Sequence, residues 1–232
     1  MIAIIDYRAG NLTSVKLAFE ALAIKAEITD SPEVILNADR VVFPGLGAAG
    51  AAMQNLHSLK LAETIRSVVR NKTPFLGICL GTQIIFEHSE EDNGVDCIGI
   101  IPGDVKRFTP TDPYDKVPHM GWNRVQQAKA HPIFEGISDN SEFYFVHSFY
   151  PVPSDQDWVI GTTDYADTTF ASAVSRENLV ATQFHPEKSG KIGLQLLKNF
   201  CNWTPEIEAG GRKSEVRSQR SATRDKGPSY AN

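Results

Sequence analysis

The sequence contains few cysteines and no spacing that would pair them. Cys79, Cys97 and Cys201 are the only three in 232 residues, and no two of them form a C-x-x-C pair. An odd number of widely spaced thiols argues against a disulfide framework and against a zinc site. The chain is also long enough to bury a stable core without a crosslink. We therefore expect a cytoplasmic protein with reduced thiols, no metal and no cofactor.

The sequence also lacks a segment that would direct it to a membrane. Met1 leads directly into the apolar residues 2–5, without the basic region and small-residue cleavage site of a secretory signal. The charge-free stretch 41–59 is interrupted by proline, glycine, asparagine and histidine. Since no apolar run reaches 18 residues, we expect no membrane span.

Basic charge is scarce in the main part of the chain. Residues 1–203 carry 17 Lys and Arg against 24 Asp and Glu, whereas residues 204–232 carry 6 against 4. An acidic body without a basic stripe is a poor partner for a phosphate backbone. The glycine patterns of dinucleotide sites and P-loops are absent as well. These absences argue against binding of nucleic acids or nucleotides.

Strand-like apolar runs alternate with helical patterns in the first part of the chain. In the stretch 11–24, for example, Val15, Phe19 and Leu22 recur at helical spacing. The predicted strands are 2–6, 26–29, 40–43 and 75–78, and the predicted helices are 11–24, 48–56, 59–71 and 80–87. This alternation predicts an α/β fold with a doubly wound, flavodoxin-like, mostly parallel sheet and helices on both faces.

The C-terminal half has a different pattern, in which short strands are separated by Gly, Pro and Asp. The predicted strands are 97–101, 104–108, 122–126, 143–147, 158–163, 169–174 and 179–184. We expect them to add antiparallel strands to the sheet and a final helix over 188–203 to cover it. The polar segment 204–232 has almost no large apolar residues. The sequence therefore predicts one domain over 1–203 and a disordered tail over 204–232.

The clearest candidate for chemistry is Cys79, which lies between a predicted strand and a predicted helix. Gly77 and Gly81 flank it in the G-x-C-x-G spacing of a nucleophile elbow, where small residues let the strand and helix pass close together. A thiolate at a helix N-terminus is stabilised by the positive end of the helix dipole. The alternative interpretation is a buried structural cysteine.

A thiolate nucleophile needs a base and a group that orients the base. His185 and Glu187 stand two residues apart at the end of a predicted strand, so their side chains point to the same side. Pro186 between them favours a strand terminus. A lone histidine is more often structural or exposed, but this pair follows a G-x-C-x-G segment and supplies both missing groups.

A glycine loop, Gly45-Leu46-Gly47, follows another predicted strand. Ligands of open α/β sheets bind at the carboxyl ends of the strands. Backbone N–H groups in such a loop can stabilise the oxyanion that forms when a thiolate attacks an amide. The alternative is a turn that uses glycine for conformational reasons alone.

Taken together, GICLGTQ around Cys79, QFHPE around His185 and Glu187, and the PGLG loop resemble the class I (triad) glutamine amidotransferases. The resemblance spans roughly residues 1–203. It implies hydrolysis of L-glutamine to L-glutamate and ammonia through a γ-glutamyl thioester on Cys79. His185 would be the acid and base, and Glu187 would orient it.

The resemblance also implies how the substrate is held. The oxyanion would be bound by the N–H of Leu80 and by an N–H of the loop Gly45-Leu46-Gly47 after a conformational change. Gln83, Ser148 and Phe149 would line the glutamine pocket. Two alternatives remain open, since Gln83 also fits an exposed helix position and Phe149 a core aromatic.

Further segments, DYRAGNL, KVPHMGWN, FYFVHSF and FHPEKSG, resemble the branch of this family that serves histidine biosynthesis. No ammonia-accepting domain fits in the chain. The resemblance implies a heterodimer with a cyclase subunit, a (β/α)8 barrel that takes the ammonia through an internal channel and makes imidazole glycerol phosphate and aminoimidazole carboxamide ribotide. The implied interface residues are Asn11, Trp122, Tyr144 and Lys188. In a monomer, Trp122 and Tyr144 would instead be core aromatics.

Arg8 departs from the family pattern, because many members have a glycine there. Three other functions remain as alternatives. The first is a glutaminase subunit for pyridoxal phosphate or anthranilate synthesis, and the second is a free-standing hydrolase of γ-glutamyl or peptide bonds. The third is a non-catalytic flavodoxin-like binding module, which would be indifferent to Cys79→Ala.

Overall fold

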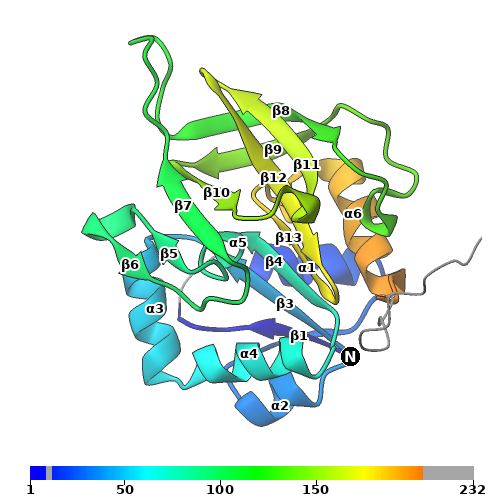
Figure 1. Ribbon diagram of the computed structural model, residues 1–232. Coiled ribbons are helices and arrows are strands. Elements are labelled where there is room, and N and C mark those ends of the chain that lie inside the picture. Colours follow the sequence, from blue (N-terminus) through cyan, green and yellow to red (C-terminus); the bar gives the residue numbers. More distant parts are fainter. Residues whose placement is uncertain (9–11, 206–232) are drawn as a thin grey trace, which may run out of the picture.

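The computed structural model describes residues 1–8 and 12–205. Its main sheet has nine strands in the order β2-β1-β3-β4-β13-β12-β11-β8-β9 (Figure 1). The first five are β2 (Ala26–Thr29), β1 (Ile2–Ile5), β3 (Arg40–Gly45), β4 (Phe75–Cys79) and β13 (Leu179–Thr182), and each pairs in parallel with its neighbours among them. This half has the order of a flavodoxin-like sheet, which confirms the predicted fold.

The sheet continues with antiparallel strands, as the C-terminal pattern predicts. They are β12 (Thr168–Arg176), β11 (Val159–Tyr165), β8 (His119–Gln127) and β9 (Ser141–His147). A second sheet beside it has the order β10-β7-β5-β6, with β10 (Phe149–Pro153), β7 (Gly103–Arg107), β5 (His88–Ser89) and β6 (Val95–Asp96). The molecule therefore joins a parallel half to an antiparallel half through β13.

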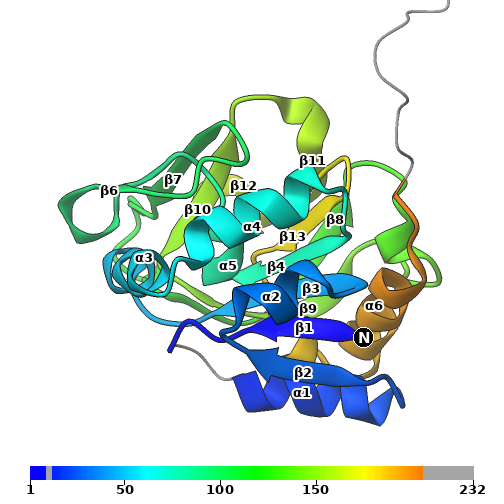
Figure 2. The same cartoon turned by 90° about the horizontal axis from the view of Figure 1, so that it is seen from below.

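Helices cover both faces of the parallel half (Figure 2). The helices are α1 (Leu12–Ala21), α2 (Pro32–Leu36), α3 (Ala49–Ser58), α4 (Leu61–Arg70), α5 (Leu80–Gln83) and α6 (Gly190–Asn202). Ala3 and Ile5 of β1 belong to the core cluster under α2, α3 and α4, whereas Ile2 and Ile4 belong to the cluster under α1 and α6. Strand side chains alternate between faces, so a strand buried on both faces is apolar at every position.

Four short 3₁₀ helices lie in the connections: η1 (Glu91–Asn93), η2 (Pro132–Phe134), η3 (Gln156–Trp158) and η4 (Pro186–Lys188). In the described part of the chain, no helix has the length and apolar character needed to cross a membrane. The predicted tail lies, from residue 206 onward, outside the described residues.

Two predicted elements are wrong, and for one reason. The helix predicted over 80–87 ends at Gln83, and the strand predicted over 97–101 is absent from the described structure of that segment. The carbonyl of Ile84 accepts from the N–H of Ile98, and the carbonyl of Ile85 accepts from the N–H groups of Ile100 and Ile101. Both segments use their backbone groups for partners outside themselves. The N–H groups of 97–101 donate to the loop after α5, and the N–H of Glu87, which a helix reaching residue 87 would direct to Gln83, donates to the carbonyl of Gly103.

Strand β10 is not predicted, because Pro151 and Pro153 interrupt its pattern. It lies at the edge of the second sheet, where it pairs with β7 on one side. Proline is tolerated on an edge strand, because one side of such a strand has no neighbouring strand and the missing N–H of proline costs no hydrogen bond there. The first residue of β10 is Phe149, one of the predicted pocket residues.

Candidate active site

Three adjacent parallel strands bring the predicted chemical groups to one edge of the sheet. Gly45, at the end of β3, is in register with Cys79, at the end of β4. Thr182, at the end of β13, is in register with Ile78 on the other side of β4. The glycine loop, Cys79 and the segment with His185 therefore leave the sheet side by side, at the edge where such sheets bind ligands.

Cys79 occupies a sharp turn between β4 and α5. Its backbone has φ 54 and ψ −108, a conformation that is costly for a residue with a side chain. A Cβ on Gly81 would lie 1.9 Å from the carbonyl oxygen of Phe43, and one on Gly77 would lie 3.0 Å from Cβ of Ala181. Only glycine at these positions lets helix and strands approach so closely, which is the packing that a nucleophile elbow requires.

His185 and Glu187 form a buried pair. Nδ1 of His185 lies 2.7 Å from Oε1 of Glu187, and the two side chains are 2% and 3% exposed. Nε2 of His185 is buried without a hydrogen-bond partner among the described residues, so it is the ring nitrogen left for Cys79. Burial alone would lower the pKa of His185, but a thiolate on Cys79 and the carboxylate of Glu187 outweigh it and raise the pKa to about 10. The site thus favours the protonated form of His185.

The antiparallel half fixes the backbone around His185. The N–H of His185 donates to the carbonyl of Tyr144 at 2.9 Å, and the hydroxyl of Ser189 donates to the carbonyl of His185 at 2.6 Å. The same hydroxyl accepts from the N–H of Tyr144 at 3.0 Å. Strand β9 therefore holds the histidine in place over the end of β4.

A cavity of about 240 Å³ opens beside Cys79. Seven of the predicted site residues line it: Leu46, Gly47, Cys79, Leu80, Gln83, Ser148 and Phe149. Gly45 does not line it. A Cβ on Gly45 would lie 2.6 Å from the hydroxyl of Tyr7 and 2.7 Å from Cβ of Leu80, so Gly45 is needed for close packing beneath the loop. Larger cavities of about 620 and 300 Å³ lie elsewhere, around Arg176 and Glu177, and share no residue with this one.

The alternative interpretation of Gln83 as an exposed helix residue is wrong. Its side chain is 4% exposed, and Nε2 donates to the carbonyl of Phe149 at 2.8 Å and to Oε1 of Gln183 at 3.0 Å. Gln183 is a residue that sequence reasoning missed. It is buried, and its Nε2 lies 3.7 Å from Sγ of Cys79. Its signal was an amide two residues before His185, at the end of an apolar strand.

Glu91 is the second missed residue. It lines the cavity, and its Oε2 accepts from the N–H of Ala49 at 2.7 Å. Burial raises the pKa of Glu91, and the hydrogen bond from Ala49 opposes that rise. A carboxylate in this position complements a cationic group on a ligand. No sequence signal separated Glu91 from its acidic neighbours Glu90 and Asp92.

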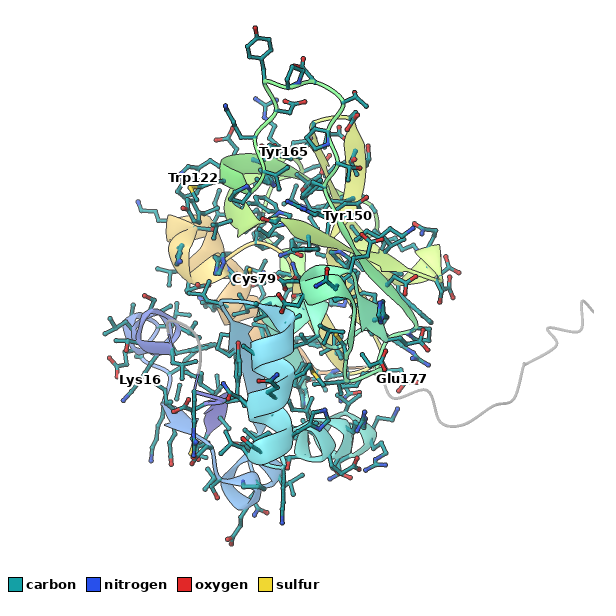
Figure 3. All side chains as sticks on the ribbon, turned by 90° about the vertical axis from the view of Figure 1, so that its left-hand side faces the viewer. Lys16, Cys79, Trp122, Tyr150, Tyr165 and Glu177 are labelled. Atoms are coloured by element: carbon teal, nitrogen blue, oxygen red, sulfur yellow. The ribbon has the colours of Figure 1, made fainter. Side chains whose placement is uncertain are left out.

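The predicted interface residues with described positions lie together: Trp122 on β8, Tyr144 on β9 and Lys188 in η4. Trp122 is 55% exposed, so the alternative of a core aromatic is wrong for it. Its ring lies 6.1 Å from that of Tyr144, and Nζ of Lys188 lies 5.9 Å from the Tyr144 ring. Figure 3 shows Trp122 at the edge of the molecule and Cys79 near its centre. Asn11 lies outside the described residues.

Arg8 has a left-handed backbone conformation, with φ 63. Glycine adopts this conformation without steric cost. The backbone at this position therefore has a conformation that suits glycine. Arg8 adopts it, and its N–H donates to Oδ1 of Asp6 at 2.8 Å.

Comparison with known proteins agrees with this geometry. The family model of class-I glutamine amidotransferases matches residues 3–203, and the chain belongs to that family. Among curated relatives, imidazole glycerol phosphate synthase subunit HisH of Nitrosococcus oceani is 50% identical over 204 residues, covering 87% of this chain and 97% of its own. The same subunit of Methanocaldococcus jannaschii is 52% identical over 200 residues, covering 86% and 98%.

Solved structures support the fold. PurLQS from Thermotoga maritima has a TM-score of 0.66 at 15% identity and covers 87% of this chain and 97% of the matched chain. A glutamine amidotransferase from the same organism has a TM-score of 0.59 at 16% identity, covering 87% and 82%. The predictions of family and fold are both confirmed.

Proposed function

We propose that the protein hydrolyses L-glutamine to L-glutamate and ammonia and delivers the ammonia to a separate cyclase, as the glutaminase subunit of an imidazole glycerol phosphate synthase. One observation carries the proposal. Cys79 occupies a strained elbow and lines a cavity of about 240 Å³, next to the buried His185–Glu187 pair. The identity of about 50% to two HisH subunits over nearly their whole length supports the choice of pathway.

The thiolate of Cys79 attacks the side-chain carboxamide carbon of glutamine, and a C–S bond forms. The N–H of Leu80 is the first candidate donor to the resulting oxyanion, because the first amides of a helix have no partner within it. His185, protonated at Nε2, gives its proton to the leaving nitrogen, and the C–N bond breaks. Ammonia leaves and a γ-glutamyl thioester remains on Cys79.

In the second half of the reaction, His185 is neutral and takes a proton from water as the water attacks the thioester. The C–S bond then breaks, which releases glutamate and restores the thiolate beside a protonated His185. Glu187 keeps Nδ1 of His185 as the hydrogen-bond donor, so that Nε2 handles the proton in both steps.

The cavity walls suit glutamine at both ends. Gln83, Ser148 and Phe149 are placed to bind the substrate, and an amide of the Gly45–Gly47 loop is the second candidate for the oxyanion. The carboxylate of Glu91 complements the α-ammonium group of the substrate. The glutamine pocket therefore combines residues of both sheets.

For the partner, we propose a (β/α)8 barrel that docks on the face with Trp122, Tyr144 and Lys188. An exposed tryptophan next to a second aromatic and a cation is the type of surface that carries binding energy in interfaces. We take residues 1–203 as the amidotransferase domain, in agreement with the family match. We place the enzyme in the cytoplasm, since its three cysteines are unpaired.

Glutamate release from glutamine tests the proposal, measured for the chain alone and with the cyclase and its nucleotide substrate. Cys79→Ala serves as the control. Strong stimulation by the cyclase supports the proposed function. Equal activity with and without the cyclase would still support the catalytic role of the triad, but it would indicate that the protein serves another pathway or is a free-standing hydrolase.

A further inference from the structure

Two histidines that the reaction does not use lie side by side between the proposed docking face and the glutamine pocket. His119 on β8 and His147 on β9 are cross-strand partners, and both are buried. Nδ1 of His119 lies 3.0 Å from Nε2 of His147. The ring of His119 is stacked between Tyr165, at 3.9 Å between centroids, and Phe145, at 4.8 Å. The pair is therefore held rigidly in an aromatic layer.

The hydrogen bonds at both ends extend this pair into a chain. At one end, Nδ1 of His147 lies 2.7 Å from the carbonyl oxygen of Phe149. At the other end, Nδ2 of Asn123 lies 3.2 Å from Nε2 of His119. Asn123 also donates to the carbonyl of Asp164 at 2.9 Å and accepts from the N–H of Arg124 at 2.8 Å, which fixes the orientation of its amide.

Only one arrangement of protons satisfies this chain. The carbonyl of Phe149 can only accept, so His147 carries its proton on Nδ1 and accepts at Nε2. His119 must then donate from Nδ1 and accept at Nε2 from Asn123. Burial lowers the pKa of His119 to about 4 and that of His147 to about 3, so both rings are neutral and each has one N–H. Every hydrogen bond runs in one direction, from Asn123 to Phe149.

The two ends of the chain meet the two surfaces that the proposed function needs. The carbonyl of Phe149 also accepts from Nε2 of Gln83, and Phe149, Gln83 and His147 all line the cavity beside Cys79. Asn123 directly follows Trp122 on β8, so the backbone of this strand connects the chain to the proposed docking face, on which Trp122 is exposed and from which the Asn123 side chain points away. A shift of β8 at this face would reach the pocket wall through three hydrogen bonds.

We propose that Asn123, His119 and His147 form a positioning relay that holds the Phe149 carbonyl and the Gln83 amide in the geometry that binds glutamine. The proposal rests on the proposed function, because it assigns the relay to that substrate. None of the three residues is a catalytic residue. A buried carbonyl that loses its donor turns or recruits water, and the Gln83 amide that shares it moves with it. Breaking the relay therefore weakens glutamine binding and leaves the chemical step intact.

The proton arrangement is tested first, without any activity measurement. Long-range ¹H–¹⁵N correlation spectra of the ¹⁵N-labelled full chain distinguish the two neutral tautomers of histidine. We expect both His119 and His147 to carry the proton on Nδ1, unchanged between pH 5.5 and 8. An Nε2–H tautomer in either ring, or titration of either within that range, would overturn the relay.

Kinetics in the complex with the cyclase then test its role. His119→Phe keeps an aromatic ring in the stack but removes both hydrogen bonds, and we expect the KM for glutamine to rise about tenfold with kcat nearly unchanged. Asn123→Ala removes only the terminal donor, and we expect a rise of about threefold. The matched control is Tyr165→Phe, which keeps the ring stacked on His119 and removes only a hydroxyl that bonds the carbonyl of Lys116, outside the chain of hydrogen bonds.

A lower melting temperature with an unchanged KM in both variants would show a purely structural role and overturn the proposal. An equal rise of KM in Tyr165→Phe would overturn it as well, because the effect would then arise without any change in the chain of hydrogen bonds. If the wild-type complex shows no glutaminase activity, the proposed function fails, whereas the tautomers still report on the chain of hydrogen bonds.

Discussion

The two halves of the main sheet contribute to the active site in different ways. The parallel half supplies chemistry through the ends of its strands: Cys79 ends β4, the Gly45–Gly47 loop follows β3, and His185 follows β13. The antiparallel half, with β10 beside it, supplies the pocket wall at Phe149 and the face with Trp122. The comparison teaches that the proposed reacting groups come from the parallel half and the proposed partner face from the antiparallel half, so substitutions in each half should damage different steps.

The largest effect is expected for Cys79→Ala in the parallel half. Glutamate release should fall by about 10⁴-fold or more, because no other group can form the thioester. Complex formation with the cyclase and thermal unfolding should stay close to wild type. Both are measured on the same preparation. Loss of folding in this variant would show that Cys79 has a structural role, and it would contradict the contrast drawn between the two halves.

Glu187→Gln is the second test of the parallel half. The amide keeps the shape but no longer stabilises the protonated His185 or fixes its tautomer, so kcat should fall by about 10²- to 10⁴-fold. Steady-state kinetics with saturating glutamine measure this. Glu177→Gln is the matched control, since Glu177 pairs with Lys72 on the surface, and it should leave kcat unchanged. Equal kcat values for the two variants would contradict the role of Glu187.

Trp122→Ala tests the antiparallel half. We expect the Kd for the cyclase to rise by about 30-fold, the typical loss for an aromatic at the centre of an interface, with kcat at saturating cyclase preserved. Calorimetric titration measures the affinity. Leu36→Ala, which shortens an exposed apolar side chain on α2, should change nothing. A large drop in melting temperature with unchanged affinity would show that Trp122 serves stability instead.

The smallest effect concerns pH. Burial lowers the pKa of His119, His131 and His147, to about 4, 4 and 3. The unfolded chain takes up protons at these residues below its ordinary histidine pKa of about 6.5, while the folded chain does not. The contribution of these three histidines to the free energy of unfolding should therefore be fully present above pH 6.5 and be lost as the pH drops from about 6.5 to 4. Urea unfolding at several pH values measures this.

His131→Gln provides the control for the pH effect, because it removes one of the three groups and lies away from the cavity beside Cys79. The variant should show a shallower loss of stability between pH 6.5 and 4. An identical slope would mean that His131 is protonated in the folded protein.

Much of the parallel half was predictable from the sequence, because its signals are local. Four apolar strands, the G-x-C-x-G spacing at Cys79 and the His185–Glu187 pair each occupy a few consecutive residues. Family membership follows from the same segments. Of the missed residues, Glu91 carries no local signal that separates it from Glu90 and Asp92, whereas Gln183 is marked only by its position two residues before His185.

The antiparallel half was harder, because its structure depends on distant partners. The strand predicted over 97–101 is a loop whose N–H groups bind the carbonyls of Ile84 and Ile85. Strand β10 contains two prolines and exists because it can pair along one edge of β7. Propensity describes a segment in isolation, whereas these outcomes depend on which acceptor or edge another segment leaves free.

The sequence by itself determined the order of strands and helices in the parallel half and the types of group that the reaction needs. Hydrophobic periodicity and glycine spacing act over a few residues, so they can be interpreted without knowing the fold. The tertiary structure alone decided that His185 meets Cys79, that Gln83 is buried, and that Asn123 connects to Phe149 through two histidines. Those relations join residues far apart in the chain, and only the pairing of strands in the folded sheets brings their side chains close together.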